Sequence, residues 1–545
     1  MTKVLTLTLC VATALVVSAQ GLDPAAILKP GGTWPTLYGD YTARRYSPLA
    51  QINQTNVSRL AQAWTFNAGI AMKSTPLMVD GVLYFTAPDR AWAIDAQTGK
   101  QIWTFDRPSR GNHLANRGVA LYRDRVYFGT PDAFLVCLEA KTGRKVWEVP
   151  MADVTFGYYM SGPPLVLGDR LIVGISGDAA DVTGFLKAVD PDTGKVLWTW
   201  ESVPQWGEPG SETWPNKEAM MHGGGATWVQ GSYDPALGLI YWGTGNPHPV
   251  VNGVERKGAN LYTCSIVALH ADTGKLAWYF QPSPHDMADR DATETVVLVD
   301  GLFRGRQRKM LMQASRNGYF FVLDRATGER LLTVPYGPQN WSSGLNRRGE
   351  PIPDMKKAPS RDGVLFQGSG TNWHTPSFSP ETGLFYVNAN LGGWRIAYLT
   401  FAGDDEQPED HQGGASSSLG AGEPALLAID YQTGQIKWRL GYGNASGILT
   451  TAGGLLFTSN SGYAVALDPA TGKTLWKADV GGATTNAPIT YEWAGRQYVI
   501  MAARNTLIAL ALPAPGPIAS AAARRASPCR VVTASSSAPC PRARP

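Results

Sequence analysis

The chain has 545 residues, of which 44% are hydrophobic and 17% charged, so it is long enough and apolar enough to bury a large core. Its formal net charge is +4, but Lys3 and five arginines after residue 513 supply six positive charges, and the remaining body carries −2. A nearly neutral body argues against a nucleic-acid partner.

The first residues are typical of a secretory signal. Lys3 precedes an apolar run, and the small residues Ser18 and Ala19 suit cleavage by a signal peptidase. This run is shorter than the ~20 residues of a membrane-spanning helix, and no later segment is as long and uncharged. We therefore expect a signal peptide at residues 1–20, no membrane span, and a periplasmic or secreted protein.

One motif recurs along the chain, and its constant length indicates a repeat fold. Each copy has an acidic residue or a substitute after an apolar run, Thr-Gly three and four residues later, and Trp or Leu eight residues later. The seven copies end at Trp103, Trp147, Trp198, Trp278, Leu332, Trp438 and Trp476.

Each copy predicts a β-hairpin, because Gly permits the positive φ of a tight turn between two strands. The closing Trp can then pack between neighbouring four-stranded sheets arranged around a channel. An eighth sheet can combine residues 496–513 with residues 56–66, where Trp64 supplies the missing aromatic residue. We therefore predict an all-β, eight-bladed β-propeller with tryptophan-docking motifs, closed by N- and C-terminal strands.

Two intervals between copies are much longer than the others, from Asp190 to His270 and from Asp324 to Asp430. They predict long inserted loops, which in a propeller usually build the binding face. The repeats leave no room for a separable second domain, so we expect one domain from residue 25 to 513.

The chain after residue 513 differs from the rest. Residues 514–545 are rich in Ala, Pro, Ser and Arg and lack apolar periodicity, which predicts a disordered tail. Cys529 and Cys540 lie there and could pair in an oxidising compartment. Cys137 and Cys264 lie in apolar, strand-like runs, which indicates buried thiols rather than ligands. No C-x-x-C-H motif is present, so a redox enzyme of this sequence would pass its electrons to another molecule.

Several strings between the repeats carry further information. They are WPTLYGDYTARRYSPLAQINQTNVSRLAQAW (Trp34 to Trp64), NRGVALY, GTGNP, PHDMADRD and TNWH. In this order, they resemble the alcohol dehydrogenases that use pyrroloquinoline quinone (PQQ), and the similarity runs from Trp34 to Pro513. The resemblance implies PQQ with Ca²⁺ or a lanthanide ion, hydride transfer from an alcohol, polyol or sugar, and a separate cytochrome or other electron acceptor.

PQQ is a flat tricyclic quinone with three carboxylates, so its site needs an aromatic face, cations and small donors. The resemblance implies that Trp228 stacks on the ring, that Arg117 pairs with its acid groups, and that Arg316 donates to its quinone oxygens. Taken alone, the tryptophan would more often belong to the core and each arginine to the surface. Smaller contributions to cofactor binding are implied for Ser161, Ser176, Gly177, Asn372 and Trp373.

The resemblance also implies the chemistry. Asp289 of PHDMADRD matches the carboxylate that takes the alcohol proton, and Arg316 is the second catalytic residue. Asn246 of GTGNP matches a metal ligand, Asp289 is another, and Asp291 is the position that adds a ligand in lanthanide-using members. In isolation, the DRD string would instead be read as a solvated acidic turn.

Two features that the resemblance leads us to expect are missing: a disulfide that covers the cofactor ring and one metal ligand. Gly111 and Asn112 stand where the family has an adjacent cysteine pair, so no vicinal disulfide can cover the ring. Ala179 stands where the family has a glutamate ligand. Either the neighbouring Asp178 binds the metal, or the site has fewer ligands.

The substrate pocket also departs from the family. Ala445 occupies the position of one pocket tryptophan, and AARNTLIAL lacks the other, which predicts an open pocket and an alcohol larger than methanol. Lys73 replaces a family acid and could meet a quinone carboxylate.

These departures leave a second hypothesis open, a non-catalytic propeller that serves as a scaffold or binding protein, similar to the lipoprotein of outer-membrane assembly. A scaffold has no reason to combine Trp228, Asn246, Asp289, Arg316 and Asn372, so the enzyme is favoured. Motifs of nucleophile elbows, P-loops and HExxH metalloproteases are absent from the sequence.

Overall fold

The protein is described by a computed structural model that covers residues 24–177, 182–400, 413–443, 446–484 and 486–513. Contacts divide the chain into the units Met1–Leu512 and Pro513–Pro545. All of the described strands and helices lie in the first unit. The predicted signal peptide, the predicted tail, Cys529 and Cys540 lie outside the described residues. None of the helices in the described ranges has the length and hydropathy needed to cross a bilayer.

The first half of the unit forms four antiparallel sheets, or blades. Blade 1 contains β3 (Leu77–Val79), β4 (Val82–Ala87), β5 (Arg90–Asp95) and β6 (Gln101–Asp106). Blade 2 contains β7 (Ala120–Tyr122), β8 (Arg125–Gly129), β9 (Phe134–Glu139) and β10 (Lys145–Pro150). Blade 3 contains β11 (Leu165–Leu167), β12 (Arg170–Gly174), β13 (Phe185–Val189) and β14 (Val196–Glu201). Blade 4 contains β15 (Ser232–Asp234), β16 (Leu239–Gly243), β17 (Ile266–His270) and β18 (Leu276–Phe280).

The second half adds four more blades. Blade 5 contains β19 (Val297–Phe303), β20 (Arg306–Ala314), β21 (Tyr319–Asp324) and β22 (Arg330–Pro335). Blade 6 contains β26 (Ser377–Ser379), β27 (Leu384–Leu399), β29 (Glu423–Asp430) and β30 (Ile436–Gly441), and β25 (Val364–Gly370) and β28 (Gly414–Gly420) also pair with β27. Blade 7 contains β31 (Leu449–Thr451), β32 (Leu455–Asn460), β33 (Tyr463–Leu467) and β34 (Thr474–Asp479), with β1 (Tyr46–Ser47) parallel to β31. Blade 8 contains β35 (Ile489–Trp493), β36 (Arg496–Ala503), β37 (Thr506–Ala511) and β2 (Ala61–Asn67).

The turn inside each repeat is fixed by its own residues, as blade 1 shows. Oδ1 of Asp95 accepts hydrogen bonds from the backbone N–H and the hydroxyl of Thr98, both at 2.7 Å. Gly99 follows with a φ of +71°. The acidic residue thus replaces backbone partners within the turn, and glycine supplies the left-handed conformation. The predicted tight turn between two strands is therefore confirmed in this blade.

Each closing tryptophan docks on the turn of the next blade. Nε1 of Trp103 donates to the carbonyl oxygen of Ala140 at 2.8 Å, and a Cβ added to Gly143 would lie 2.7 Å from the Trp103 ring. Only glycine can therefore occupy that turn position. Further indole nitrogens donate to the next blade in the pairs Trp198 to Ala271, Trp278 to Arg325, Trp438 to Pro469 and Trp476 to Leu60.

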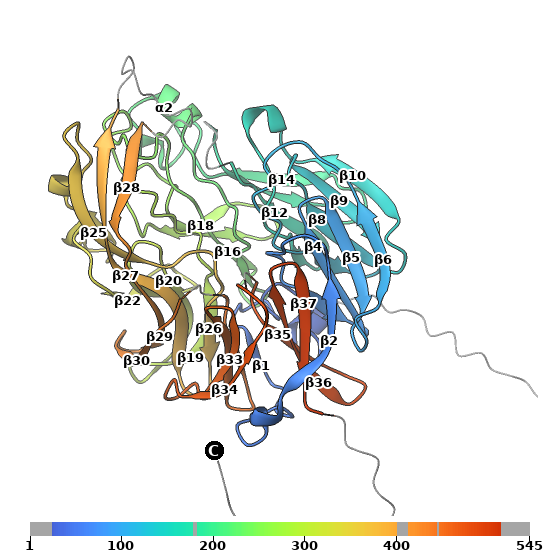
Figure 1. Cartoon of the computed structure of the whole chain (residues 1–545). Helices are drawn as coiled ribbons and strands as arrows, with labels where there is room; N and C mark the ends of the chain where they lie inside the picture. Colours follow the sequence, from blue (N-terminus) through green and yellow to red (C-terminus); the bar gives the residue numbers. More distant parts are fainter. Residues whose placement is uncertain (1–23, 178–181, 401–412, 444–445, 485, 514–545) are drawn as a thin grey trace, which may run out of the picture. The chain divides into compact units, whose positions relative to one another are not determined.

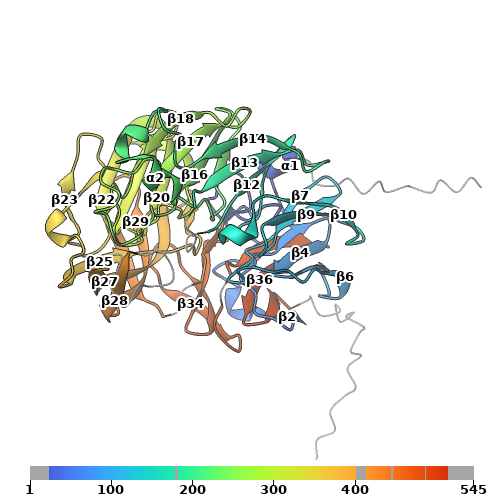
Figure 2. The same ribbon diagram turned by 90° about the horizontal axis from the view of Figure 1, so that it is seen from above.

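The same contacts close the ring. β2 pairs antiparallel with β37, so blade 8 joins the two ends of the unit, as the blue and red strands in Figure 1 show. Trp476 of blade 7 binds Leu60 just before β2, and Trp64 of β2 packs on Gly99 of blade 1. Figure 2 shows the blades following one another in chain order around a common centre. The predicted eight-bladed propeller is confirmed.

Short helices and extra strands lie mainly in the insertions. The first insertion holds η3 (Ser211–Thr213) and α2 (Lys217–Met221), and the second holds β23 (Ser342–Leu345), β24 (Pro351–Pro353), η4 (Met355–Lys357), β25 and β28. The other helices of the described ranges are α1 (Pro24–Leu28), η1 (Val57–Arg59) and η2 (Val154–Phe156). Cys137 and Cys264 are free and fully buried, as predicted.

Candidate active site

Three predicted cofactor-binding residues from different parts of the chain form one stack. The guanidinium carbon of Arg117 lies 4.8 Å from the ring centroid of Trp228 and 4.9 Å from that of Trp373. Arg117 is buried, and both tryptophans are partly buried. A guanidinium is attracted to an aromatic face by the charge distribution of the ring. The stack therefore holds a cation and two planar faces in one place.

Small donors lie next to this stack. The hydroxyl oxygens of Ser161 and Ser176 are 2.7 Å apart, and the backbone N–H of Arg117 donates to the carbonyl oxygen of Ser161 at 2.9 Å. Gly177 follows Ser176 and is buried. A Cβ on Gly162 would lie 2.9 Å from the carbonyl oxygen of Trp228, so glycine allows the serine loop to approach the tryptophan. These predicted residues are therefore brought together.

Asp291 joins the stack to the predicted metal ligands. Its Oδ2 accepts a hydrogen bond from Nε1 of Trp228 at 2.9 Å, and its Oδ1 accepts one from the backbone N–H of Asn246 at 2.7 Å. Nη1 of Arg316 lies 3.6 Å from the same Oδ2. Asp291 is only 2% exposed, so these partners stabilise a charge that burial would otherwise make costly. The DRD string is thus part of a built site rather than a solvated turn.

Asp289 and Arg316, the two predicted catalytic residues, form an ion pair. Asp289 has a φ of +57°, a conformation rarely adopted outside glycine, and its side chain is 40% exposed. Burial alone lowers the pKa of Arg316, but the negative charges of Asp289 and Asp291 outweigh it and hold that pKa above its ordinary value. The cation therefore stays charged, and it lies beside a carboxylate that solvent can reach.

The remaining predicted residues are less tightly bound into the site. Asn372 is exposed, and its Oδ1 accepts a hydrogen bond from the backbone N–H of Trp373 at 2.8 Å. It lines the same cavity as Asp289 and Arg316. Asp178 lies outside the described residues. Within the described ranges, no cluster of three or more His, Cys, Asp or Glu side chains is placed to hold a metal ion.

Two residues of the site were not singled out from the sequence. His374 stacks on Trp373 with ring centroids 4.3 Å apart, and burial, with the charges of Arg117 and Lys73, lowers its pKa to about 4. Glu294 is 4% exposed, and burial and the charge of Asp291 raise its pKa to about 8. The TNWH string contained the histidine, whereas Glu294 has no sequence signal because its burial depends on tertiary packing.

The fold and the site define a β-propeller with a stacked aromatic and cationic site beside paired carboxylates. Comparison with known proteins specifies the family. Residues 34–342 and 416–499 match the PQQ family described as "Glucose/ethanol/alcohol dehydrogenase, beta-propeller domain". The chain is 36% identical to quinohemoprotein alcohol dehydrogenase ADH IIB of Pseudomonas putida over 543 residues, which covers 91% of this chain and 77% of that protein.

Two further proteins are similar over most of their length. Quinoprotein alcohol dehydrogenase PedH of Pseudomonas putida is 35% identical over 513 residues, with 84% of this chain and 83% of that protein covered. The solved structure of a europium-containing methanol dehydrogenase superposes with a TM-score of 0.82 at 30% identity, covering 90% of this chain and 99% of that one. The chain therefore belongs to the PQQ-dependent alcohol dehydrogenase family, and the predicted family and enzyme class are confirmed.

Proposed function

We propose that this protein oxidises an alcohol beside Asp289, with PQQ stacked on Trp228 and a hard metal ion next to it. The observation that carries the proposal is the unbroken set of contacts from Trp228 through Asp291 and Arg316 to Asp289. It connects an aromatic face for the cofactor to a carboxylate that a substrate can reach. A scaffold propeller has no use for this arrangement, and the family match also favours the enzyme.

The residues fit a planar quinone with three carboxylates. Trp228 and Trp373 offer aromatic faces, and Ser161 and Ser176 offer hydroxyl groups. Arg117, Arg316 and Lys73 supply positive charge, and the charge of Arg117 contributes to lowering the pKa of Lys73, after burial. An anion between these two cations would relieve their repulsion. Lys73, at a position where the family has an acid, would therefore bind a carboxylate of the quinone.

The residues also fit a hard metal ion in the kind of donor they offer. Asn246, Asp289 and Asp291 provide amide and carboxylate oxygens, which Ca²⁺ and lanthanide ions prefer. Arg316 forms ion pairs with both Asp289 and Asp291, so the two carboxylates lie on the same side of the site. Three protein ligands are few for an ion that takes about 6–8 oxygens. We propose that Asp178 or oxygens of the cofactor and water complete the set.

The chain's own residues perform the proton chemistry. Asp289 accepts the hydroxyl proton of the alcohol as a general base, for which its side chain is both charged and reachable. Arg316 lies beside it and stabilises negative charge that develops on nearby oxygens. When bound, the quinone supplies the oxidant that accepts a hydride from the alcohol carbon.

We further propose that the protein is exported and gives its electrons to a separate cytochrome or other acceptor. The signal-like residues 1–20 support export, and similarity to the 1-butanol dehydrogenase (cytochrome c) of Thauera butanivorans, 32% identical over 524 residues, supports a cytochrome as the acceptor. The propeller boundaries at 25 and 513, and the tail at 514–545, stay predictions.

Reconstitution tests this proposal. The purified protein is incubated with PQQ and either Ca²⁺ or a lanthanide, and its absorption and its dye reduction are followed with a panel of alcohols. We expect saturable PQQ binding and alcohol-dependent dye reduction. If the protein neither binds PQQ nor reduces the dye with any metal, the proposal is wrong and the non-catalytic propeller becomes the favoured alternative.

A further inference from the structure

A cavity of about 860 Å³ opens beside Asp289 and Arg316. More arginine side chains line it than the proposed reaction needs. Arg290, Arg316 and Arg395 line it, and Asp289 is the one carboxylate among its described lining residues. Burial, with the nearby cations, lowers the pKa of His374 to about 4, so its imidazole is neutral at pH 7 and adds no charge to the cavity. The cavity therefore has an excess of positive charge.

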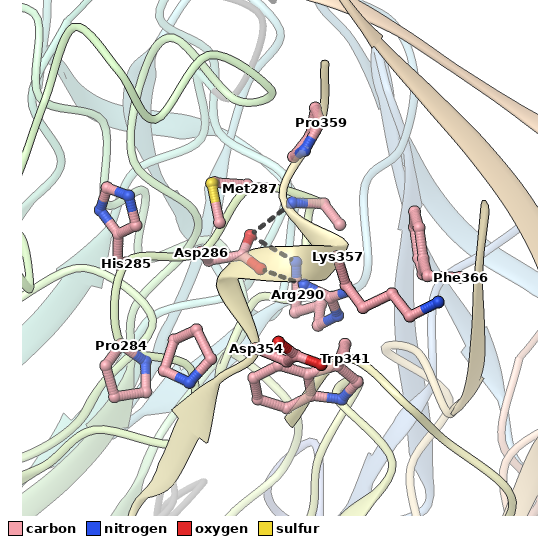
Figure 3. Close-up of a pocket in the computed structure, with 12 residues that line it drawn as sticks. Pro284, His285, Asp286, Met287, Arg290, Trp341, Asp354, Lys357, Pro359 and Phe366 are labelled. Carbon is pink, nitrogen blue, oxygen red and sulfur yellow. Dashed lines mark hydrogen bonds and ion pairs between the residues drawn. The ribbon is translucent and has the colours of Figure 1, made fainter. Parts of the chain in front are cut away.

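Two of the three arginines have partners in the protein. Arg316 pairs with Asp289. Arg290 bonds Oδ1 of Asp286 at 3.1 Å, and its guanidinium lies 4.6 Å from the ring of Trp341, as Figure 3 shows. These contacts fix both side chains and neutralise their charge in part.

Arg395 differs from them. It lies on β27, paired in register with Phe366 of β25 and with Ser418 of β28. No hydrogen bond or ion pair joins its guanidinium to another described residue, and its Nε is buried without an acceptor. Arg290 lines the same cavity and carries a positive charge of its own. The two cations thus repel each other across the cavity wall.

A second unsatisfied group lines the same cavity. Asn388 is 6% exposed, and its Nδ2 donates to the carbonyl oxygen of Ser446 at 2.6 Å. Its Oδ1 is buried and accepts no hydrogen bond from the described residues. A buried acceptor without a donor costs about 1–3 kcal/mol, so a bound hydroxyl group would be favourable there. Apart from Phe366 and Tyr442, the remaining lining residues are small or polar.

Building on the proposed function, we propose that the substrate is an alcohol that also carries an anionic group, such as a carboxylate, bound by Arg395. A guanidinium matches a carboxylate through two parallel N–H donors, and a charge-assisted hydrogen bond is about twice as strong as a neutral one. The anion also relieves the repulsion between Arg395 and Arg290. A further hydroxyl group of the substrate can donate to Oδ1 of Asn388.

The test compares alcohols of equal length and different charge in the reconstituted enzyme. The pairs are 4-hydroxybutanoate with 1-butanol and 6-hydroxyhexanoate with 1-hexanol, and 6-amino-1-hexanol is the cationic member. We expect kcat/KM for the better hydroxy acid to exceed that of its neutral partner about tenfold or more, with the amino alcohol poorest. Arg395→Gln should bring the acid-to-neutral ratio close to one, and Arg395→Lys should retain part of it. Arg306→Gln, which removes an exposed arginine at the start of β20, is the control and should keep the ratio.

A binding measurement separates this inference from the proposed function. The same compounds are titrated calorimetrically into Asp289→Asn protein loaded with PQQ and metal, where turnover does not interfere. Tighter binding of the hydroxy acid, lost in the double variant with Arg395→Gln, supports the inference. Equal binding of acid and neutral alcohol, or a preference that survives Arg395→Gln, overturns it. Failure of every alcohol to reduce the dye would contradict the proposed function, and the titration would still decide the charge preference.

Discussion

Nε1 of Trp228 donates a hydrogen bond to Oδ2 of Asp291 over 2.9 Å, which fixes the aromatic face to a carboxylate of the proposed metal site. The other oxygen of Asp291 accepts the backbone N–H of Asn246 at 2.7 Å. Both carboxylate oxygens are therefore oriented by the protein. A substitution of Trp228 can therefore also alter the metal site. The effects on cofactor stacking and on metal binding are separated by substitutions that remove either the aromatic face or the N–H donor.

Replacing Trp228 tests the stacking role. Trp228→Ala removes the aromatic face, and we expect PQQ affinity to fall about tenfold or more because stacked aromatic pairs are worth about 0.5–1.5 kcal/mol beyond the area they bury. Trp228→Phe keeps a face but loses the N–H donor, so its affinity should lie between those of Trp228→Ala and the wild type. Equilibrium dialysis with PQQ measures both, and circular dichroism checks that the blades remain folded. Equal affinity in all three proteins would rule out stacking on this residue.

Replacing Asp289 tests the general base. Asp289→Asn keeps the shape of the side chain but cannot accept a proton at neutral pH, so kcat should fall about 10²–10⁴-fold while PQQ still binds. Stopped-flow dye reduction at saturating alcohol gives kcat, and the PQQ titration is the control for cofactor loading. A variant with near-normal turnover would show that another group takes the proton.

The sequence predicted those parts of the molecule that depend on local residues. The turn at Asp95, Thr98 and Gly99 is satisfied within five residues, so its repetition fixes the blades. Trp228 and Asp289 lie in short strings and were found through a family resemblance. Arg395 could not be found this way, because its place beside the cavity follows from the pairing of β25, β27 and β28. The high pKa of Glu294 likewise arises from burial by residues distant in sequence.

The docking tryptophans should dominate the stability of the propeller. Trp103 is 7% exposed and donates to Ala140 of the next blade, so Trp103→Ala should lower the free energy of unfolding by about 3–5 kcal/mol. Leu332 occupies the equivalent position of blade 5, so Trp103→Leu reproduces a natural solution and should cost clearly less. Urea denaturation of the two variants measures the difference. Equal losses would mean that the hydrogen bond, which both variants lack, outweighs apolar packing.

Glu294 should make stability depend on pH in protein free of cofactor and metal. Its pKa is raised from 4.5 to about 8, so between these values the folded state binds more protons than the unfolded state. The free energy of unfolding therefore falls as pH rises through this window. Glu294→Gln stays neutral, and its stability relative to wild type should increase by roughly 1–3 kcal/mol from pH 5 to pH 8.

Urea midpoints at the two pH values measure this change. Glu329→Gln replaces an exposed carboxylate and serves as the control, for which we expect no such trend. A Glu294→Gln variant that loses stability relative to wild type at pH 8 would show that the carboxyl group is ionised and stabilising in the fold.

The choice of metal should depend on Asp291. With Ala179 in place of a family glutamate, the described ligands are Asn246, Asp289 and Asp291, and a trivalent ion gains more than Ca²⁺ from each carboxylate. We expect a lanthanide to support dye reduction at least as well as Ca²⁺. Asp291→Ala should remove any lanthanide advantage first, since it removes one of two negative charges.

Asp291→Asn is the matched variant for this prediction. It keeps an oxygen that can accept the N–H of Trp228 or of Asn246 but removes the charge. If charge selects the metal, both Asp291 variants should lose the lanthanide advantage, whereas if orientation of Trp228 matters more, the asparagine variant should keep it. Competition between Ca²⁺ and a lanthanide, followed by lanthanide luminescence, gives relative affinities that do not depend on turnover. Activity with Ca²⁺ alone that is unchanged by Asp291→Ala would make Asp291 a residue that only positions Trp228, because the metal would then be held by Asn246, Asp289 and the cofactor.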